Sequence, residues 1–222
     1  MAGFFITMEG VDGCGKSTQI QRLAARLGRA GVPVAVSKEP GGTPLCQDLR
    51  SLLLEPHASG ETWAPRAELL LFYADRAQHV EKFIAPMLAQ GKVVLLDRFD
   101  DSTRAYQGAQ GTGDGALDWL RAEVLGGLAP ALTLVLDLDP AQSLARTGVR
   151  NAAAAEFRET RFDQETLEFH RRVRERFLDL ARREPDRMVV IPAHGPVEAV
   201  EAAIWAQAAP RLREAGHPVT GT

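Results

Sequence analysis

The sequence predicts an α/β protein in which five parallel strands form an open sheet, helices cover both faces, and a small lid is added. Five short apolar segments alternate with segments of helical periodicity along the 222 residues, an order typical of a parallel sheet with crossover helices. The segment 93–97 has no polar residue before its last position, which indicates a strand buried on both faces. A glycine-rich loop at 10–17 joins the first strand to the first helix. We therefore expect a ligand at the carboxyl ends of the strands.

Length, charge and cysteine content narrow the class of protein. The 222 residues suit one domain with an inserted lid, and 45% hydrophobic residues are enough to form a core. With a formal net charge of −3, we expect neither nucleic acid nor a membrane as a partner. Cys14 and Cys46 have no metal-ligand spacing and suggest no disulfide framework, which favours a reducing cytoplasm. We find no targeting segment and no apolar run of membrane-spanning length, so we expect a cytoplasmic protein.

The expected strands are short and apolar. They span residues 4–9, 34–37, 93–97, 132–138 and 188–191. Residues 38–43 follow the second strand, and their proline and glycines favour a loop. Residues 99–115 follow the third strand and form a polar stretch that we interpret as a loop.

The expected helices are segments whose apolar residues recur at helical spacing. They begin after the glycine-rich loop, at Thr43 or Pro44, and at Asp139-Pro140, and span about 65–90, 117–125, 164–183 and 197–209. Asp139 is a typical N-cap, and Pro140 suits the first helical position. Pro86 is expected to kink or interrupt the helix that contains it.

Two segments of the single domain 1–222 have no clear helical or strand pattern. Residues 146–161 lack an apolar period and include four consecutive alanines, so we interpret them as a mobile lid that is partly helical. Residues 216–222 are interpreted as a frayed tail.

The loop at 10–17 carries the first chemical prediction. It reads Gly-Val-Asp-Gly-Cys-Gly-Lys-Ser and matches G-x-x-x-x-G-K-[ST], in which backbone N–H groups wrap a triphosphate, the lysine neutralises charge and the hydroxyl reaches Mg²⁺. A glycine turn without a ligand is the alternative, but three glycines beside a lysine have little packing purpose at this junction. The Asn-Lys-x-Asp sequence that GTPases use to recognise the base is absent, since the only asparagine, Asn151, precedes alanine.

Asp97 and Arg98 stand where the third strand ends, beside the expected phosphate loop. An aspartate at this position can hold the Mg²⁺ shell, and an arginine can clamp a phosphate that is transferred between two nucleotides. An exposed ion pair at a strand end is the alternative interpretation.

Several motifs together resemble the thymidylate kinase family, in the bacterial-type branch of the P-loop nucleoside-monophosphate kinases. The matching segments are 10–18, 39–43, 49–54, 70–76, 97–98 with 101–103, and 106–108. They occur in the family's order and spacing, while the second half of the chain matches mainly through the lid and the helix after it. The resemblance implies the P-loop NTPase fold, transfer of the γ-phosphate of ATP to dTMP, a requirement for Mg²⁺, and a homodimer.

The resemblance also implies roles on the ATP side. Lys16 would neutralise the transferring phosphoryl group, and Ser17 and Asp97 would bind Mg²⁺. The residues implied to contact ATP are Gly10, Val11, Asp12, Gly13, Cys14, Gly15, Lys16, Ser17, Thr18 and Arg146. Cys14 lies at a helix N-terminus beside Lys16, conditions that lower a thiol pKa, so it is either a reactive thiol protected by ATP or simply a small structural residue.

On the dTMP side, the implied contacts match the chemistry of each residue. Arg50 and Arg98 would hold the dTMP phosphate, since two guanidinium groups suit a dianion. Phe72 would stack on thymine, and Arg76, one helical turn later, would donate to its O4 carbonyl. The other implied contacts are Tyr106 against the sugar, where it excludes a ribose 2′-hydroxyl, Asp12 at the 3′-hydroxyl or the metal shell, and Glu39, Pro40, Ser102, Thr103 and Gln107 around the pocket.

Structural alternatives remain open for these residues. Arg50 could be a solvated helix arginine, and Phe72 could be a core residue while Arg76 pairs with Asp75 or Glu68. The residues between 102 and 107 could serve ordinary loop packing.

The lid is where the sequence departs from the family's pattern. Gly13 occupies the position at which another branch of the family places an arginine, so the catalytic arginine would come from the lid. The candidates are Arg146, Arg150 and Arg158, and Arg161-Phe162-Asp163 resembles the family's closing segment. We assign Arg150 to the phosphates and Arg146 to the adenine face, with solvated lid arginines as the alternative.

Two other functions remain open at this stage. One is a kinase for another nucleotide, such as dUMP, or for a deoxynucleoside. Arg50 with Arg98 favours a substrate that already carries phosphate, and Arg76 with Tyr106 favours a deoxythymidine. The other is a regulatory protein in which ATP closes the lid without catalysis.

Overall fold

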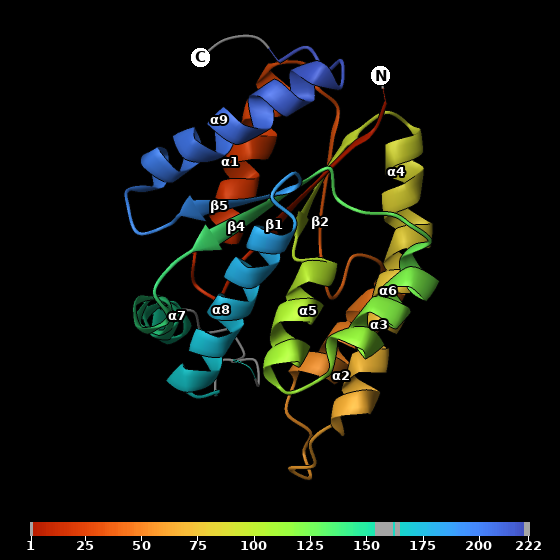
Figure 1. The fold of residues 1–222 in the computed structure, drawn as a ribbon, viewed down its shortest axis with the longest axis vertical. Helices are drawn as coiled ribbons and strands as arrows, with labels where there is room; N and C mark the ends of the chain where they lie inside the picture. The colour runs from red at the N-terminus through yellow and green to blue at the C-terminus, as the bar shows by residue number, and fades with distance from the viewer. Residues whose placement is uncertain (1, 154–161, 163–164, 220–222) are drawn as a thin grey trace.

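A five-stranded parallel sheet forms the middle layer of the structure, a computed structural model that describes residues 2–153, 162 and 165–219 (Figure 1). The strands are β1 (Phe4–Glu9), β2 (Val34–Lys38), β3 (Val93–Asp97), β4 (Leu132–Asp137) and β5 (Met188–Pro192). Their order is β2-β3-β1-β4-β5, and each neighbouring pair runs parallel. The predicted parallel sheet is therefore confirmed.

Helices surround this sheet. They are α1 (Lys16–Arg29), α2 (Pro44–Leu54), α3 (Pro65–His79), the π-helical η1 (Val80–Ile84), α4 (Ala85–Ala89), α5 (Asp100–Ala109), α6 (Asp114–Leu125), α7 (Pro140–Ala153), α8 (Leu167–Arg183) and α9 (Val197–Glu214). The segment 65–90 is thus interrupted just before Pro86, as predicted.

Alternate residues of the central strand β1 pack into separate apolar clusters, because successive side chains of a strand point to opposite faces. Ile6 belongs to the cluster that contains Leu23 of α1. Phe5 belongs to a second cluster with Ile84 and Leu125. Both faces of the sheet are therefore covered, as predicted.

The sheet register brings distant residues to one edge. Met8 of β1 lies opposite Asp97 of β3, so the loop that follows β1 starts beside the end of β3. The N–H of Arg98 donates to the Met8 carbonyl at 3.0 Å. Two segments almost 90 residues apart therefore meet at the carboxyl edge.

Three predictions about local structure are corrected. The polar stretch 99–115 contains α5, whose polar side chains are buried, including Asp101 and Gln107, so that helix shows no apolar period. The last helix does not stop at 209, because α9 continues through Pro210 and buries Leu212. The segment 216–219 is not frayed, since His217 and Val219 are buried.

Part of the predicted lid lies in α7, which is helical to Ala153. Its remaining residues, 154–161, lie outside the described residues, as do 220–222 of the predicted tail. Of the helices described, none combines the length and the apolar character needed to cross a membrane.

Candidate active site

The glycine-rich loop joins β1 to α1 through backbone conformations that favour glycine. Gly10, Gly13 and Gly15 have φ angles of 131°, 79° and 100°. A Cβ on Gly10 would lie 2.5 Å from the Leu136 carbonyl oxygen, so this position also requires close backbone packing. Gly15 is the N-cap of α1 and offers no side-chain cap, which leaves the first-turn N–H groups for an anion.

Lys16 and Ser17 stand at the start of α1 with partners inside the protein. The Lys16 ammonium is 6% exposed and donates to the carbonyl oxygens of Gly10 at 3.2 Å and Val11 at 3.0 Å. The Ser17 hydroxyl donates to Asp97 Oδ2 at 2.7 Å. The loop and the end of β3 thus bring the Ser17 hydroxyl and the Asp97 carboxylate side by side. Thr18, the next residue of α1, is exposed.

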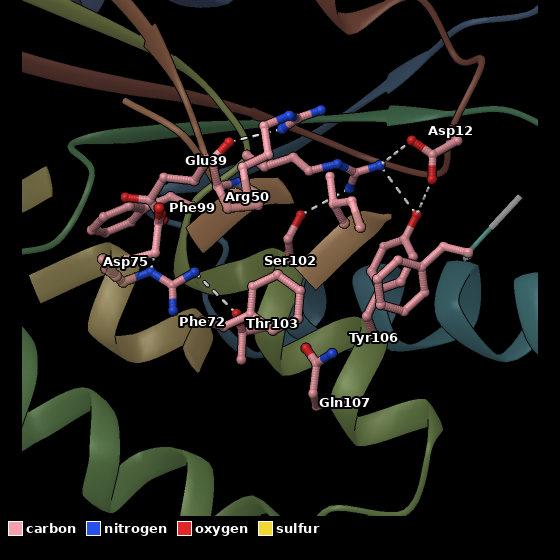
Figure 2. A pocket seen from close by; sticks show the side chains of 15 residues that line it. Asp12, Glu39, Arg50, Phe72, Asp75, Phe99, Ser102, Thr103, Tyr106 and Gln107 are labelled. Atoms are coloured by element: carbon pink, nitrogen blue, oxygen red, sulfur yellow. Dashed lines mark hydrogen bonds and ion pairs between the residues drawn. The ribbon is translucent and has the colours of Figure 1, made fainter. Parts of the chain in front are cut away.

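Arg98 connects the loop to α5. Its backbone has a φ of 70°, an uncommon conformation for a residue with a side chain. Its guanidinium donates to the Gly10 carbonyl at 3.0 Å, to Ser102 Oγ at 2.9 Å and to Asp12 Oδ1 at 2.7 Å. The Tyr106 hydroxyl donates to Asp12 Oδ2 at 3.1 Å (Figure 2). Arg98 therefore pairs with Asp12 rather than with its neighbour Asp97.

The charges around Asp12 determine its ionisation. Burial by itself would raise the pKa of Asp12, but the positive charges of Arg98 and Lys16 outweigh it and hold that pKa below its usual value. Asp12 is therefore an ionised acceptor between the phosphate loop and the neighbouring pocket.

Glu9, the last residue of β1, is a site residue that sequence reasoning missed. It is fully buried, and its Oε1 accepts the Phe99 N–H at 2.7 Å while its Oε2 bonds to the Ser102 hydroxyl. Burial and the charge of Asp101 raise the pKa of Glu9 to about 8, against the opposing effects of Ser102 and Arg98. Glu9 thus holds the backbone and the α5 turn that follow Arg98. A charged residue at the end of an otherwise apolar strand was the available signal.

A pocket opens beside Arg98 at the carboxyl edge of the sheet. It has an empty volume of about 630 Å³, including solvent at its mouth. Its lining residues are Asp12, Glu39, Pro40, Arg50, Leu54, Phe72, Asp75, Arg76, Arg98, Phe99, Ser102, Thr103, Tyr106, Gln107 and Phe162. Every residue that was predicted to contact dTMP is among them.

Arg76 is the most buried of the arginines that line this pocket. It is 2% exposed, and it donates from Nε to Glu39 Oε2 at 2.9 Å and from Nη2 to Thr103 Oγ1 at 3.0 Å. Its Nη1 has no hydrogen-bond partner among the described residues and lies 3.6 Å from Asp100 Oδ1. The alternative in which Arg76 pairs with Asp75 or Glu68 is not what the structure shows.

Glu39 is itself braced by His79. His79 Nδ1 lies 2.9 Å from Glu39 Oε1, and its Nε2 lies 2.9 Å from Ser37 Oγ. A Cβ on Gly42 would lie 2.0 Å from the His79 ring, so the glycine permits the close approach of the loop after β2. Histidine, glutamate and arginine form one buried chain that ends in the pocket.

Arg50 faces the same pocket as Arg98. Its Nη1 donates to the Pro40 carbonyl at 2.8 Å. Burial and the nearby charge of Arg98 lower the pKa of Arg50, as expected for two guanidinium groups that approach one another without an anion between them. Arg50 is therefore not a solvated helix residue.

The remaining predicted residues have different outcomes. Arg146 is exposed on α7, with Nη1 3.4 Å from the Ala193 carbonyl. The backbone of Arg150 belongs to α7, but its side chain, like Arg158 and Arg161, lies outside the described residues. Cys14 is buried, and burial raises its pKa despite the charge of Lys16. Of the two interpretations of Cys14, its burial favours the small structural residue, because desolvation outweighs the nearby cation.

A phosphate loop at the end of β1, a serine–aspartate pair at the next strand and an arginine-lined pocket beside them define a P-loop kinase of the nucleotide class. Comparison with known sequences identifies the family. A sequence model of the family described as thymidylate kinase matches residues 8–204. The chain therefore belongs to the thymidylate kinase family.

Individual relatives agree along nearly the whole chain. Thymidylate kinase from Caulobacter vibrioides is 51% identical over 203 residues, which cover 91% of this chain and 94% of the relative. Thymidylate kinase from Deinococcus radiodurans is 48% identical over 216 residues, which cover 97% and 98%. The crystal structure of thymidylate kinase from Ehrlichia chaffeensis superposes with a TM-score of 0.74 at 33% identity, covering 93% of this chain and 98% of the other.

Proposed function

We propose that the chain transfers the γ-phosphoryl group of ATP to dTMP, forming dTDP and ADP. The observation that carries this proposal is the position of Arg98, which contacts both the phosphate loop through the Gly10 carbonyl and the neighbouring pocket through Asp12 and Ser102. One arginine thus lies between the place expected for a triphosphate and a pocket lined by arginine and aromatic side chains. Membership of the thymidylate kinase family supports the same pair of substrates.

The acceptor phosphate is held by Arg50 and Arg98. Burial and then the charge of Arg98 lower the pKa of Arg50, and a bound dianion relieves the repulsion between the two cations. With the phosphate placed there, an acceptor oxygen attacks the γ-phosphorus while the bond to the β-phosphate oxygen of ATP breaks. No covalent intermediate is required, so positioning and charge neutralisation perform the catalysis.

The thymine base lies between Phe72 and the polar groups at the end of the pocket. Arg76 Nη1 is buried without a hydrogen-bond partner in the described part of the chain, and a buried donor without a partner is costly. A base carbonyl supplies the missing acceptor, as O4 of thymine does and the amino group of cytosine does not. Tyr106 and Asp12 lie where they contact the sugar.

The ATP side is organised by the loop and by Lys16. Ser17 Oγ and Asp97 Oδ2 are hard oxygen ligands 2.7 Å apart, a donor set that fits Mg²⁺. No group of three His, Cys, Asp or Glu side chains that could hold a metal occurs among residues 2–153, 162 and 165–219, in keeping with an ion that shares its coordination with substrate phosphates. When bound, Mg²⁺ neutralises charge on those phosphates. Lys16 neutralises the transferring phosphoryl group, and we assign the phosphates also to Arg150 and the adenine to Arg146.

Two copies of the chain associate through α2 and α3. These helices contact one another, and α2 exposes Leu45 and Leu52, while α3 exposes Leu70. Exposed apolar side chains on adjoining helices suit a protein interface. Sedimentation of the unaltered chain tests this association, and a monomer at micromolar concentration contradicts it. We place this dimer in the cytoplasm.

The substrate assignment is tested by ADP release from Mg-ATP with separate acceptors. The acceptors are dTMP, dUMP, ribosyl TMP, dCMP, AMP and thymidine. The proposal predicts rapid turnover with dTMP and at least tenfold less with the others. Turnover with a different acceptor preserves the kinase class but overturns the assignment of Phe72, Arg76 and Tyr106. Tight ATP binding without turnover supports a regulatory protein instead.

A further inference from the structure

The side-chain amide of Gln107, a residue that lines the pocket, is oriented by a hydrogen bond to Glu68. It lies on α5 and is 2% exposed, and its Nε2 donates to Glu68 Oε1 at 2.7 Å. Glu68 lies in the first turn of α3 and is also 2% exposed. Because a carboxylate only accepts hydrogen bonds, this contact assigns the amide nitrogen to Glu68 and leaves the amide oxygen on the other side.

The amide oxygen of Gln107 faces the space that the base occupies. It makes no hydrogen bond within the described residues, and Figure 2 shows it turned toward the side of the pocket where Phe72 and Thr103 lie. Arg76 lines the same pocket and supplies a guanidinium donor there, its Nη2 already bonded to the pocket residue Thr103. The pocket therefore offers one donor and one acceptor.

This polarity matches only one kind of pyrimidine edge. Thymine and uracil present a carbonyl beside an N–H, whereas cytosine presents an amino group beside a bare nitrogen. If the Gln107 amide turned over, its N–H would suit cytosine N3, but its oxygen would face the Glu68 carboxylate. Two acceptors at hydrogen-bond distance repel one another, so Glu68 disfavours the turned amide.

We infer that Glu68 is a specificity-determining positioning residue, whose carboxylate holds the Gln107 amide so that an acceptor meets the N3–H of thymine. The inference rests on the proposed function and names one origin of its base selectivity. Glu68 is not among the residues that line the pocket, and its contact with the pocket runs through Gln107.

The decisive variant is Glu68→Gln, which preserves shape but offers either a donor or an acceptor to Gln107. We expect its KM for dTMP to rise about fivefold, the value of one hydrogen bond, and its preference for dTMP over dCMP to fall by a similar factor. The KM for ATP and the kcat with dTMP stay within about twofold. Glu201→Gln, on the far helix α9, is the matched control and leaves all four values unchanged.

A double-mutant cycle separates positioning from general packing. In a Gln107→Leu background there is no amide to orient, so Glu68→Gln should change neither dTMP nor dCMP binding, measured by calorimetry. The exchanged pair, Glu68→Gln with Gln107→Glu, restores a donor at position 68 and an acceptor at position 107. It should recover the preference for dTMP, and it also keeps the test informative if Glu68→Gln alone does not fold.

Each outcome bears on a different claim. Equal losses of dTMP and dCMP affinity in Glu68→Gln, or the same loss in the Gln107→Leu background, overturn the inference and leave a packing role. An exchanged pair without recovered preference overturns it as well. If the unaltered chain neither binds nor phosphorylates dTMP, it is the proposed function that fails, and this is seen before any variant is made.

Discussion

The pocket beside Arg98 and the phosphate loop differ in how their polar groups are bonded within the protein. In the pocket, Arg76 and Gln107 are each anchored by a carboxylate, Glu39 or Glu68, and each keeps one polar atom without a protein hydrogen bond in the described structure. In the loop, the Lys16 ammonium is bound to the loop's own carbonyl oxygens. The pocket is therefore built before its ligand arrives, whereas the loop must exchange partners when a nucleotide binds.

The difference concerns the cost of binding. A preorganised group forms its ligand contact without losing another, so little of the binding free energy is lost to rearrangement. A group that is already hydrogen-bonded must exchange one bond for another, and the net gain is smaller. We expect the pocket for the phosphate acceptor to provide substrate selectivity. We expect the phosphate loop to provide positive charge that becomes available when ATP binds.

Lys16→Ala is expected to have the largest effect on activity. The Lys16 ammonium exchanges its hydrogen bonds to the loop carbonyls for contact with the transferring phosphoryl group, and the substitution removes it. We expect kcat to fall by about 10³-fold, the loss typical of removing a group that stabilises charge in a transition state. ADP release at saturating dTMP measures it. Lys82→Ala is the control, since Lys82 is 57% exposed and pairs with Glu81, which is 73% exposed. A Lys16→Ala enzyme with more than a tenth of the original kcat contradicts the exchange of partners.

Arg98→Ala removes the residue that connects the two regions. We expect kcat/KM for dTMP to fall by about 10²-fold, because the acceptor phosphate loses one of its two guanidinium partners. Arg98→Lys should recover little, since a compact ammonium cannot reach Gly10, Ser102 and Asp12 together. Arg182→Ala, at a side chain 73% exposed, is the control. Equal activity of the Arg98→Ala and Arg182→Ala enzymes places the acceptor phosphate elsewhere.

Gly42→Ala tests the brace behind the pocket without touching the ligand space. The new Cβ would meet the His79 ring, so we expect the free energy of unfolding in urea to fall by about 1–3 kcal/mol and KM for dTMP to rise. Gly28→Ala is the matched control, because a Cβ there meets nothing within 4 Å in α1. It should stabilise by about 0.5–1 kcal/mol. If the Gly42→Ala protein is as stable as the Gly28→Ala protein, the close contact between Gly42 and His79 does not support the pocket.

The smallest expected effect is a change in how steeply the free energy of unfolding depends on pH. Burial raises the pKa of folded Glu9 from its ordinary 4.5 to about 8, so the folded state holds the proton more tightly than the unfolded state. The stability that Glu9 contributes is complete below pH 4.5 and is lost as pH rises toward 8. Between these values the loss is at most about 1.4 kcal/mol per pH unit.

Glu9→Gln has no proton to lose, so its urea stability should decline less steeply over the same range. Comparing both proteins at pH 5, 6, 7 and 8 isolates the contribution of Glu9, because the other titrating groups are shared. Parallel declines would show that Glu9 is not the group responsible.

Much of the fold follows from short-range pattern. The segment 93–97 has to be a buried strand because it offers no polar face, and the loop at 10–17 has to contain left-handed turns because its glycines stand at those positions. The same reasoning fails for α5. Its buried face carries Asp100, Asp101 and Gln107, so polarity, which normally indicates exposure, hid a helix that packs against the pocket.

The residues of the candidate site also fall into two groups, those that a local sequence motif predicts and those that it does not. Lys16, Ser17 and Asp97 stand in motifs whose chemistry is local, and their positions follow from the order of strand, loop and helix. Glu9, Glu68 and His79 have no motif of this kind. Each acts on a residue 39 to 93 positions away, as the pairs Glu9–Ser102, Glu68–Gln107 and Glu39–His79 show.

The sequence by itself determined the parallel sheet and the phosphate loop, because apolar periodicity and glycine geometry act over a few neighbouring residues, while the residues that line the pocket were predicted from the resemblance to the thymidylate kinase family. Only the tertiary structure decided which carboxylate braces which donor, that Cys14 is desolvated rather than activated, and that the segment 216–219 is packed. The physical reason is that burial and hydrogen-bond pairing depend on distances across the fold, which no local pattern encodes.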